Sequence, residues 1–510
     1  MSCKYIYIFV AHLNYCRILL MKKILFIIGF LSQLSVSQEV ELRWAEKIPT
    51  KSQVSILGGK NGNYYTTYVD RKDKIFARSY DQFLNLKSEK EINFNLSDKR
   101  YTYDGAYFLN TGIVHFIEDF ERKTDRAFLY TGYSDFNLQT QDKLHVVNEV
   151  EDIDKISYFG SRRISPDSTK ILVYHEQQNK RKEPNILMYK VYNSTFTNVI
   201  SEGGASLPIK AKNYNTEDFR VDNNGNVYVI AKITKERSER EKNMSEYYYK
   251  LIVFGKDKQI KEFDFDYPDN DISYIDILPG ANNTFFCTGF LNNLKGSNKK
   301  KMISDEMFFA VLDCNSLELK SSKMIKVDGL YPEEFKNRED YIPYKIREIY
   351  QKSDGGYSIV AEQYTYYVVQ SKYGSYTVHI YCDISVIQTD KNSNVLSVSR
   401  IPKYQKQAGN PSITCTFKND RTYVIYEDLI KNLEAENDEQ TKRSTTSLFS
   451  SKSKNALFLL TIESDGKFKK EILYDYKESK IQPYILGSKQ ISKGEILLNA
   501  NDQIGLFKIK

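Results

Sequence analysis

The stretch Asp218-Phe-Arg-Val-Asp-Asn-Asn-Gly-Asn-Val-Tyr-Val-Ile-Ala231 places two apolar runs on either side of a short turn of Asp, Asn and Gly. Apolar runs that are joined through an Asn-Gly turn are typical of a β-hairpin. A second pair of runs follows at Tyr247–Phe254 and Ile260–Phe265, joined by Gly255-Lys-Asp-Lys. The sequence therefore predicts a unit of four antiparallel strands, with a variable loop between the second strand and the third.

The same unit recurs along the chain. A second clear copy has apolar runs at 346–350 and 357–363 around the turn Ser353-Asp-Gly-Gly, and further runs at 383–390 and 394–401. Alignment of the second strand of every copy gives eight starting positions, separated by 49 to 73 residues: Tyr64, Ile113, Ile171, Val227, Phe285, Tyr357, Tyr423 and Ile496. Repeated four-stranded units are typical of a β-propeller. We therefore expect an all-β fold, a propeller of eight four-stranded blades, with seven blades as the alternative if the unit at Tyr64 or Ile113 merges with a neighbour.

The two ends of the chain predict how such a ring closes. The last unit supplies only about three strands, at 484–490, 495–500 and 503–509. The segment Val40-Glu-Leu-Arg-Trp-Ala-Glu-Lys-Ile48 reads as a strand that belongs to no unit of its own. We expect it to be the fourth, outer strand of the last blade, because this pairing removes the open edge between the first and last blades. Trp44, the only tryptophan, would then report on closure.

The N-terminus carries the pattern of a secretory signal peptide. Met21-Lys22-Lys23 is basic, residues 24–31 are apolar but for Gly29, and residues 32–38 are mostly small or polar. The apolar run is too short to cross a bilayer, which takes about 20 residues. We expect translation to start at Met21, cleavage after Ser37, and an exported mature chain 38–510 that forms a single propeller with no transmembrane span. The alternative is a two-part membrane anchor.

Removal of residues 1–37 changes the charge balance. The chain of 510 residues has a formal net charge of +7, and four basic residues but no acidic residue lie in 1–37, which leaves +3. That balance gives no reason to expect a nucleic-acid partner. With 41% hydrophobic and 27% charged residues, the composition also excludes an integral membrane protein and a fully disordered chain. Four cysteines remain, and we favour buried thiols over disulfides because they lie in strand-like runs: Cys287, Cys314, Cys382 and Cys415.

Two short motifs resemble known propellers. Ser165-Pro-Asp-Ser-Thr-Lys-Ile-Leu-Val resembles the Ser-Pro-Asp-Gly repeat of WD-like and Tol-system periplasmic propellers, although it lacks the Gly. Ser353-Asp-Gly-Gly-Tyr-Ser-Ile-Val-Ala-Glu-Gln-Tyr364, with Asp383-Ile-Ser-Val-Ile and Ile401-Pro-Lys, resembles an uncharacterised family of exported Bacteroidota propellers over residues 340–510. The resemblance implies an exported β-propeller, and it brings neither an activity nor catalytic residues.

Basic residues gather in four predicted loops between second and third strands. The loops span 179–183, 235–242, 291–301 and 431–455, and together they carry a formal charge of +8. In a propeller these loops share one face, so the excess points to an anionic partner such as an envelope polysaccharide or an acidic protein. The alternative, which we favour, is solvated loops that keep the face soluble. The candidate binding residues here are Lys295, Lys299, Lys300 and Lys301.

Tyrosines cluster in the sixth unit, within residues 362–381. Tyrosine combines a flat apolar ring with a hydroxyl, which suits stacking on sugar rings and rigid protein contacts. The alternative, which we favour, is a long hairpin whose alternating tyrosines pack between blades; both hold if alternate residues face opposite sides. The candidate binding residues are Tyr364, Tyr366, Tyr367, Tyr373 and Tyr376.

Catalytic and metal-binding signals are poor. The mature chain has four histidines, and no two have the spacing of zinc ligands. No Gly-x-Ser-x-Gly elbow, phosphate-binding loop or sialidase-type Asp box occurs. We therefore expect no catalytic residues, no metal and no cofactor, and a binding or scaffolding module of the cell envelope (periplasmic, on the cell surface or secreted), monomeric or part of an envelope assembly. The alternative is a carbohydrate-active propeller enzyme, which would need two or three carboxylates about 5–10 Å apart at the centre of the ring.

Overall fold

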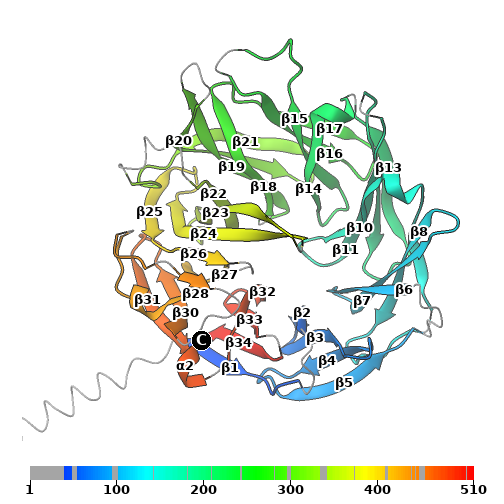
Figure 1. The fold of residues 1–510 in the computed structure, drawn as a ribbon, viewed down its shortest axis with the longest axis horizontal. Coiled ribbons are helices and arrows are strands. Elements are labelled where there is room, and N and C mark those ends of the chain that lie inside the picture. Colours follow the sequence, from blue (N-terminus) through cyan, green and yellow to red (C-terminus); the bar gives the residue numbers. More distant parts are fainter. Residues whose placement is uncertain are drawn as a thin grey trace, which may run out of the picture.

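Antiparallel strands make up nearly all of the regular secondary structure in the described chain, and they are arranged as a ring (Figure 1). The computed structural model describes residues 40–48, 54–94, 101–141, 143–180, 182–207, 209–241, 244–280, 282–295, 300–332, 342–372, 374–407, 412–437, 439–442, 444–446, 454–479, 481–500 and 502–510. The signal segment that we predict at 1–37 lies outside these residues. Within the ranges just given, no helix is both long and apolar enough to cross a bilayer.

The described strands form eight four-stranded antiparallel blades around the ring. Blades 1 to 4 are β2 (Val54–Lys60), β3 (Asn63–Val69), β4 (Ile75–Tyr80) and β5 (Leu86–Ile92); β6 (Tyr101–Phe108), β7 (Ile113–Glu121), β8 (Arg126–Ser134) and β9 (His145–Glu151); β10 (Ile156–Ile164), β11 (Lys170–Gln177), β12 (Ile186–Asn193) and β13 (Val199–Ser206); and β14 (Tyr214–Val221), β15 (Val227–Thr234), β16 (Tyr247–Phe254) and β17 (Ile260–Phe265). In each blade the first strand lies toward the centre of the ring and the fourth at its rim.

The other four blades follow the same order. They are β18 (Asn270–Pro279), β19 (Thr284–Lys295), β20 (Lys300–Asp313) and β21 (Glu318–Lys326); β22 (Tyr344–Gln351), β23 (Tyr357–Ser371), β24 (Gly374–Thr389) and β25 (Val395–Ile401); β27 (Ile413–Lys418), β28 (Arg421–Leu429), β30 (Asn455–Ile462) and β31 (Phe468–Asp475); and β32 (Tyr484–Ser492), β33 (Glu495–Asn499), β34 (Ile504–Ile509) and β1 (Val40–Trp44). Two short strands, β26 (Gln405–Gln407) and β29 (Ser444–Thr446), extend the sixth sheet. Short helical turns lie between strands: η1 (Ile153–Lys155), η2 (Ala211–Asn213), η4 (Ile430–Asn432) and α2 (Tyr476–Ser479). The fold is an eight-bladed β-propeller, so the alternative of seven blades is wrong.

Burial explains why the second strands are the clearest signal in the sequence. In β15 every residue from Val227 to Ala231 is buried, because neighbouring blades cover both faces of a middle strand. Each of the eight predicted second strands begins within two residues of the expected position. The main apolar clusters accordingly bridge neighbouring blades, as where Tyr228 of blade 4 packs edge-on against Phe285 of blade 5, with ring centres 4.8 Å apart.

The ring closes through β1, as predicted. All five residues of β1 pair antiparallel with β34, from Val40 opposite Ile509 to Trp44 opposite Gly505. The predicted strand is shorter than expected, since it ends at Trp44 and not at Ile48. A Cβ atom on Gly505 would lie 2.7 Å from the Trp44 ring, so glycine is what lets the indole lie against β34.

Two faces of the ring matter below. The blade-connection face carries the loops from the second strand to the third and the links from one blade to the next. The turn face carries the tight turns from the first strand to the second and from the third to the fourth. The four basic loops fall between β11 and β12, β15 and β16, β19 and β20, and β28 and β30, and all therefore lie on the blade-connection face, as predicted. The four cysteines are buried as thiols.

Candidate functional site

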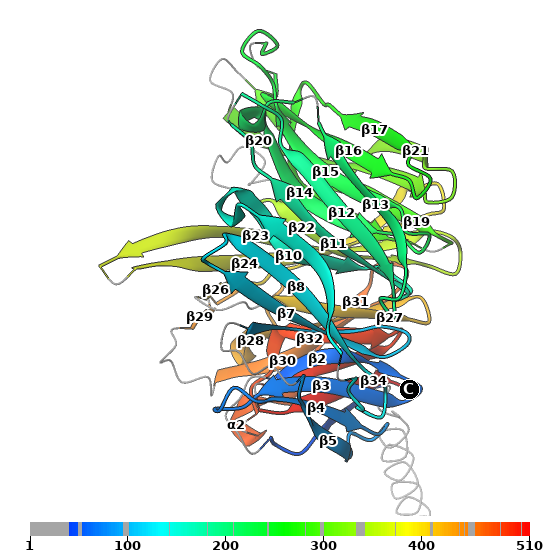
Figure 2. The ribbon, with the colours of Figure 1, turned by 90° about the vertical axis from the view of Figure 1, so that its right-hand side faces the viewer.

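The sixth blade carries an extension that the other described blades lack. β23 and β24 are 15 and 16 residues long, and their outer halves pair with each other beyond the blade, while β26 pairs with residues 379–381 at the base of this extension. We call residues 364–381 the tyrosine hairpin. Figure 2 shows that it projects from the ring, and Figure 1 shows that it lies over the centre on the blade-connection face. The long hairpin predicted from the sequence is confirmed.

Strand pairing divides the tyrosines between two faces of this hairpin. Tyr364 and Tyr366 lie opposite Tyr381 and His379, so these four side chains share one face. The Tyr364 hydroxyl contacts Nδ1 of His379 at 2.9 Å. Near the blade this face is packed, because the rings of Tyr364 and Tyr381 are 5.0 Å apart.

The other face carries Tyr367 and Tyr376. Tyr376 lies on it because it is paired with Val369, which is two residues from Tyr367 and therefore on the same face. The ammonium of Lys406 in β26 lies 5.3 Å from the centre of the Tyr367 ring, which is within reach of a cation–π interaction. The exposed fraction is 40% for Tyr367, 50% for Tyr376 and 57% for Tyr366. The expectation that alternating tyrosines pack between blades is therefore wrong for these three, because the outer hairpin extends past the neighbouring blades. Tyr373 lies outside the described residues.

A buried ion network anchors the tyrosine hairpin at its base. The Glu362 side chain is fully buried, and its carboxylate accepts hydrogen bonds from Lys403 Nζ and, at 3.0 Å, from both Arg347 Nε and Ser412 Oγ. The guanidinium of Arg347 lies 5.5 Å and 5.6 Å from the ring centres of Tyr364 and Tyr381. Two cations on one carboxylate thus hold the inner tyrosines in place. No local pattern predicts this network, because Glu362 and Lys403 are 41 residues apart in the chain.

Inner strands of several blades place charged residues near the centre of the ring. Arg162 and Asp104 form an ion pair at 2.5 Å, and Arg220 and Asp218 form one at 2.8 Å. Asp276 has only a distant cation, and burial raises the pKa of its carboxyl to about 6. Asp104 and Asp218 are thus each engaged by an arginine, whereas the Asp276 carboxyl has no close partner among the described residues. Among the described residues, no group of three or more His, Cys, Asp and Glu side chains is arranged to hold a metal ion.

Glu348 differs from the other inner-strand carboxylates of the described residues, because neither a hydrogen bond nor an ion pair reaches it. Glu348 is exposed to solvent, yet the inner strands around it displace part of the water near its carboxyl. This desolvation raises the pKa of Glu348 from 4.5 to about 7. The proton is therefore held more tightly in the folded state than in the unfolded state.

The unfolding free energy of Glu348→Gln is expected to rise relative to wild type between pH 4.5 and pH 7. Over this window the unfolded wild-type chain has lost the proton that the folded chain keeps, so wild-type stability falls as pH rises. The variant has no such proton, and we expect its melting temperature to exceed that of wild type by about 1–3 °C at pH 8. Urea unfolding at several pH values measures the difference; parallel curves for the two proteins would contradict it.

The predicted lysines flank the connection from β19 to β20, which lies on the blade-connection face. Lys295 ends β19 and Lys300 and Lys301 begin β20, while Lys299 lies outside the described residues. In the loop after β15, Lys235 already pairs with Asp266 at 2.9 Å. The binding role of these lysines stays a prediction.

Comparisons with known proteins concern the fold. No family model matches the chain, and no curated protein matches it. The WD40 domain of SCAP from fission yeast has a TM-score of 0.38 at 10% identity, over 93% of this chain and 99% of that one. The Dos1 propeller has a TM-score of 0.42 at 8% identity, over 92% and 95%. Acylaminoacyl peptidase from Pyrococcus horikoshii has a TM-score of 0.36 at 11% identity, and the match covers 89% of this chain but 59% of that one.

Proposed function

We propose that the protein is an exported binding module of the cell envelope that takes an anionic polysaccharide on the tyrosine hairpin. The single observation that carries this proposal is the hairpin face with Tyr367, Tyr376 and Lys406, two exposed rings beside a cation. The predicted signal peptide supports export, and β-propellers in general serve as binding scaffolds.

The chemistry of this face favours a charged sugar over an acidic protein. Residues 364–381 contain Lys372 but no aspartate or glutamate, so nothing on the hairpin repels an anion. Flat tyrosine faces stack on sugar rings, while Lys406 and the β19–β20 lysines attract carboxylates. A two-stranded hairpin is narrow, whereas a stable protein interface buries about 1,200–2,000 Å².

Binding to polygalacturonate, an anionic polysaccharide, is the direct test, with dextran as the neutral control. Affinity electrophoresis of the folded chain is expected to show retardation by polygalacturonate that weakens as salt is added. The double variant Tyr367→Ser/Tyr376→Ser should weaken binding at least about tenfold, because two stacking rings of about 1 kcal/mol each are removed. Tyr366→Ser, on the opposite face, is the matched control and should bind within twofold of wild type.

A second variant separates the loop lysines from the hairpin. Changing Lys295, Lys299, Lys300 and Lys301 to Ser should reduce the salt dependence and leave the aromatic contribution intact. Equal retardation by dextran and polygalacturonate would contradict an anionic ligand. If wild type binds neither polymer at low salt, a polysaccharide partner is excluded and an acidic protein becomes the better hypothesis.

A further inference from the structure

A pocket of about 660 Å³ lies on the turn face, at the end of the blades opposite the tyrosine hairpin. It is built from the first turns of four consecutive blades, which come from β18–β19, β22–β23, β27–β28 and β32–β33. β23 begins at this pocket and carries the tyrosine hairpin at its other end, so the two sites are separate. Volumes of 300–1,000 Å³ are typical of small-molecule sites. We call this cavity the turn pocket.

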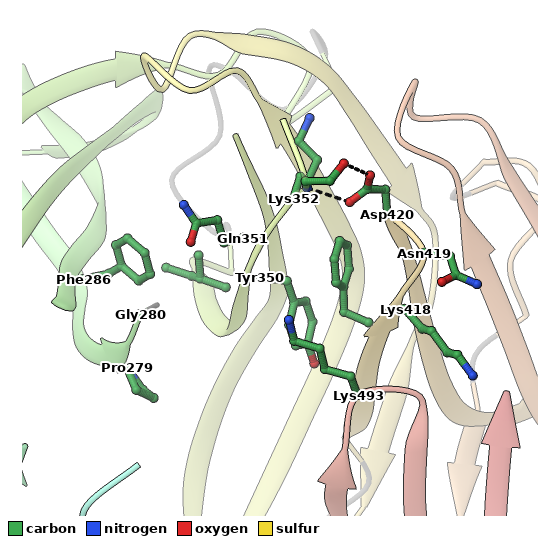
Figure 3. A pocket seen from close by; sticks show the side chains of 13 residues that line it. Pro279, Gly280, Phe286, Tyr350, Gln351, Lys352, Lys418, Asn419, Asp420 and Lys493 are labelled. Carbon is green, nitrogen blue, oxygen red and sulfur yellow. Dashed lines mark hydrogen bonds between the residues drawn. The ribbon is translucent and has the colours of Figure 1, made fainter. Parts of the chain in front are cut away.

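Aromatic side chains form the walls of the turn pocket (Figure 3). Tyr350 and Phe417 stack with ring centres 5.3 Å apart and planes 11° apart. The Tyr350 hydroxyl donates to Oε1 of Gln490 at 3.0 Å, which fixes the ring from behind. Phe286 stands across the pocket from Tyr350 in Figure 3, and it packs edge-on against Tyr357 at 5.1 Å. The apolar walls are therefore held in place before any ligand arrives.

The polar residues of the pocket leave a positive charge available. Asp420 is the only carboxylate among the described lining residues, and it accepts hydrogen bonds from the backbone N–H and the hydroxyl of Ser353. The ammonium of Lys352 pairs with Asp354 at 3.2 Å. Lys493 is exposed, and no hydrogen bond or ion pair within the described chain engages its ammonium.

The close-up separates Lys493 from the other basic residue on this side. Lys493 extends from its turn toward Tyr350, whereas Lys418 points away from Tyr350 (Figure 3). Lys418 also donates to the carbonyl oxygen of Ile509 at 2.7 Å. The cation that is free to meet a ligand thus stands beside the aromatic wall.

We propose that the turn pocket binds a small amphipathic organic anion. Its ring or short apolar part packs between Phe286 and the Tyr350–Phe417 pair, and its carboxylate, sulfonate or phosphate group meets the ammonium of Lys493. An anionic group is preferred because Lys493 lacks a carboxylate partner, and an apolar part is preferred because the walls are aromatic. This inference does not depend on the polysaccharide proposed for the opposite face.

Two probes with nearly the same rings test the pocket. 1-Anilinonaphthalene-8-sulfonate carries a sulfonate, and N-phenyl-1-naphthylamine is its uncharged counterpart; both fluoresce more strongly in apolar surroundings. Titration of the folded chain should show one saturable site for the sulfonate. Lys493→Met should weaken the sulfonate at least about fivefold and change the neutral probe less than twofold, and Lys493→Glu should weaken the sulfonate further.

The matched control is Lys391→Met, an exposed lysine in the β24–β25 turn of the same face that does not line the pocket, and it should bind both probes as wild type does. Sulfonate binding that is unchanged in both Lys493 variants would overturn the proposal. Loss of binding in Tyr367→Ser/Tyr376→Ser would place the probe on the tyrosine hairpin and would also overturn it. Absence of any saturable sulfonate binding to the wild-type chain would be equally decisive against it.

Discussion

Deletion of residues 39–48 is expected to lower the melting temperature by roughly 5–10 °C. The described part of this segment supplies the whole of β1, and beyond the strand Ala45 and Ile48 donate backbone hydrogen bonds to Ile504 at 2.8 Å and Asp502 at 2.7 Å. Ala45 and Ile48 are buried in a cluster that joins blade 8 to blade 1. Their removal exposes this cluster and leaves β34 as an open edge.

Differential scanning calorimetry measures the deletion, and Glu41→Ser/Arg43→Ser is the matched control. Those two side chains pair with each other on β1 and lie away from the core, so the control should melt within about 1 °C of wild type. In the intact chain the fluorescence of Trp44, which packs 5.3 Å from Tyr474, should change in the same transition as the circular dichroism. A deletion variant that melts like wild type would show that ring closure contributes no stability.

Glu362→Gln is expected to cost about 3–5 kcal/mol of unfolding free energy, the usual effect of removing one partner from a buried ion pair. Among the described residues, the variant loses the one carboxylate bonded to Lys403 Nζ, and the Lys403 side chain is fully buried. Arg347 loses its ion-pair partner at the same time. Two cations then remain in the base of the tyrosine hairpin without the carboxylate that they shared, and a glutamine amide carries no charge to replace it.

The double variant Glu362→Gln/Lys403→Met distinguishes the cost of burying an unpaired charge from the cost of altered packing. It should recover a substantial part of the lost stability in urea unfolding, because a buried methionine needs no counter-ion. Glu91→Gln, which breaks the exposed pair with Lys74 at 2.8 Å, is the control and should cost less than about 1 kcal/mol. If the double variant is less stable than Glu362→Gln alone, the destabilisation does not come from uncompensated charge.

The sequence predicts those parts of this propeller that repeat or that lie close together along the chain. Val227–Thr234 is recognisable because both faces of a second strand are buried, so its residues are apolar without interruption. The closing strand is recognisable because the last repeat supplies only three strands, while the segment at 40–48 belongs to no repeat of its own. Such features are local, and each can be read without knowing what lies beside it in space.

Features made by distant residues escape this kind of analysis. The turn pocket combines Phe286, Tyr350, Phe417 and Lys493, which come from four different blades. These residues are far apart in the sequence, so no single stretch of the chain indicates the pocket. The alternation of side chains along a strand does not predict the exposure of Tyr367 and Tyr376. It assigns residues to two faces of the strand, but it does not show whether a neighbouring blade covers either face. Strand length decides that question, since the tyrosine hairpin extends past its neighbours.

The pairing of β1 with β34 also sets a delay during synthesis. Val40 can pair with Ile509 only after nearly the whole chain has been synthesised, whereas the strands of every other blade come from nearby parts of the chain. At a ribosomal rate of about 5–20 residues per second, the first described strand stays without its partner for roughly 25–95 s. Throughout that interval the adjacent charges of Glu41 and Arg43 oppose pairing of β1 with the strand edge of another nascent chain. Two charged side chains on the closing strand therefore disfavour its aggregation before the ring exists.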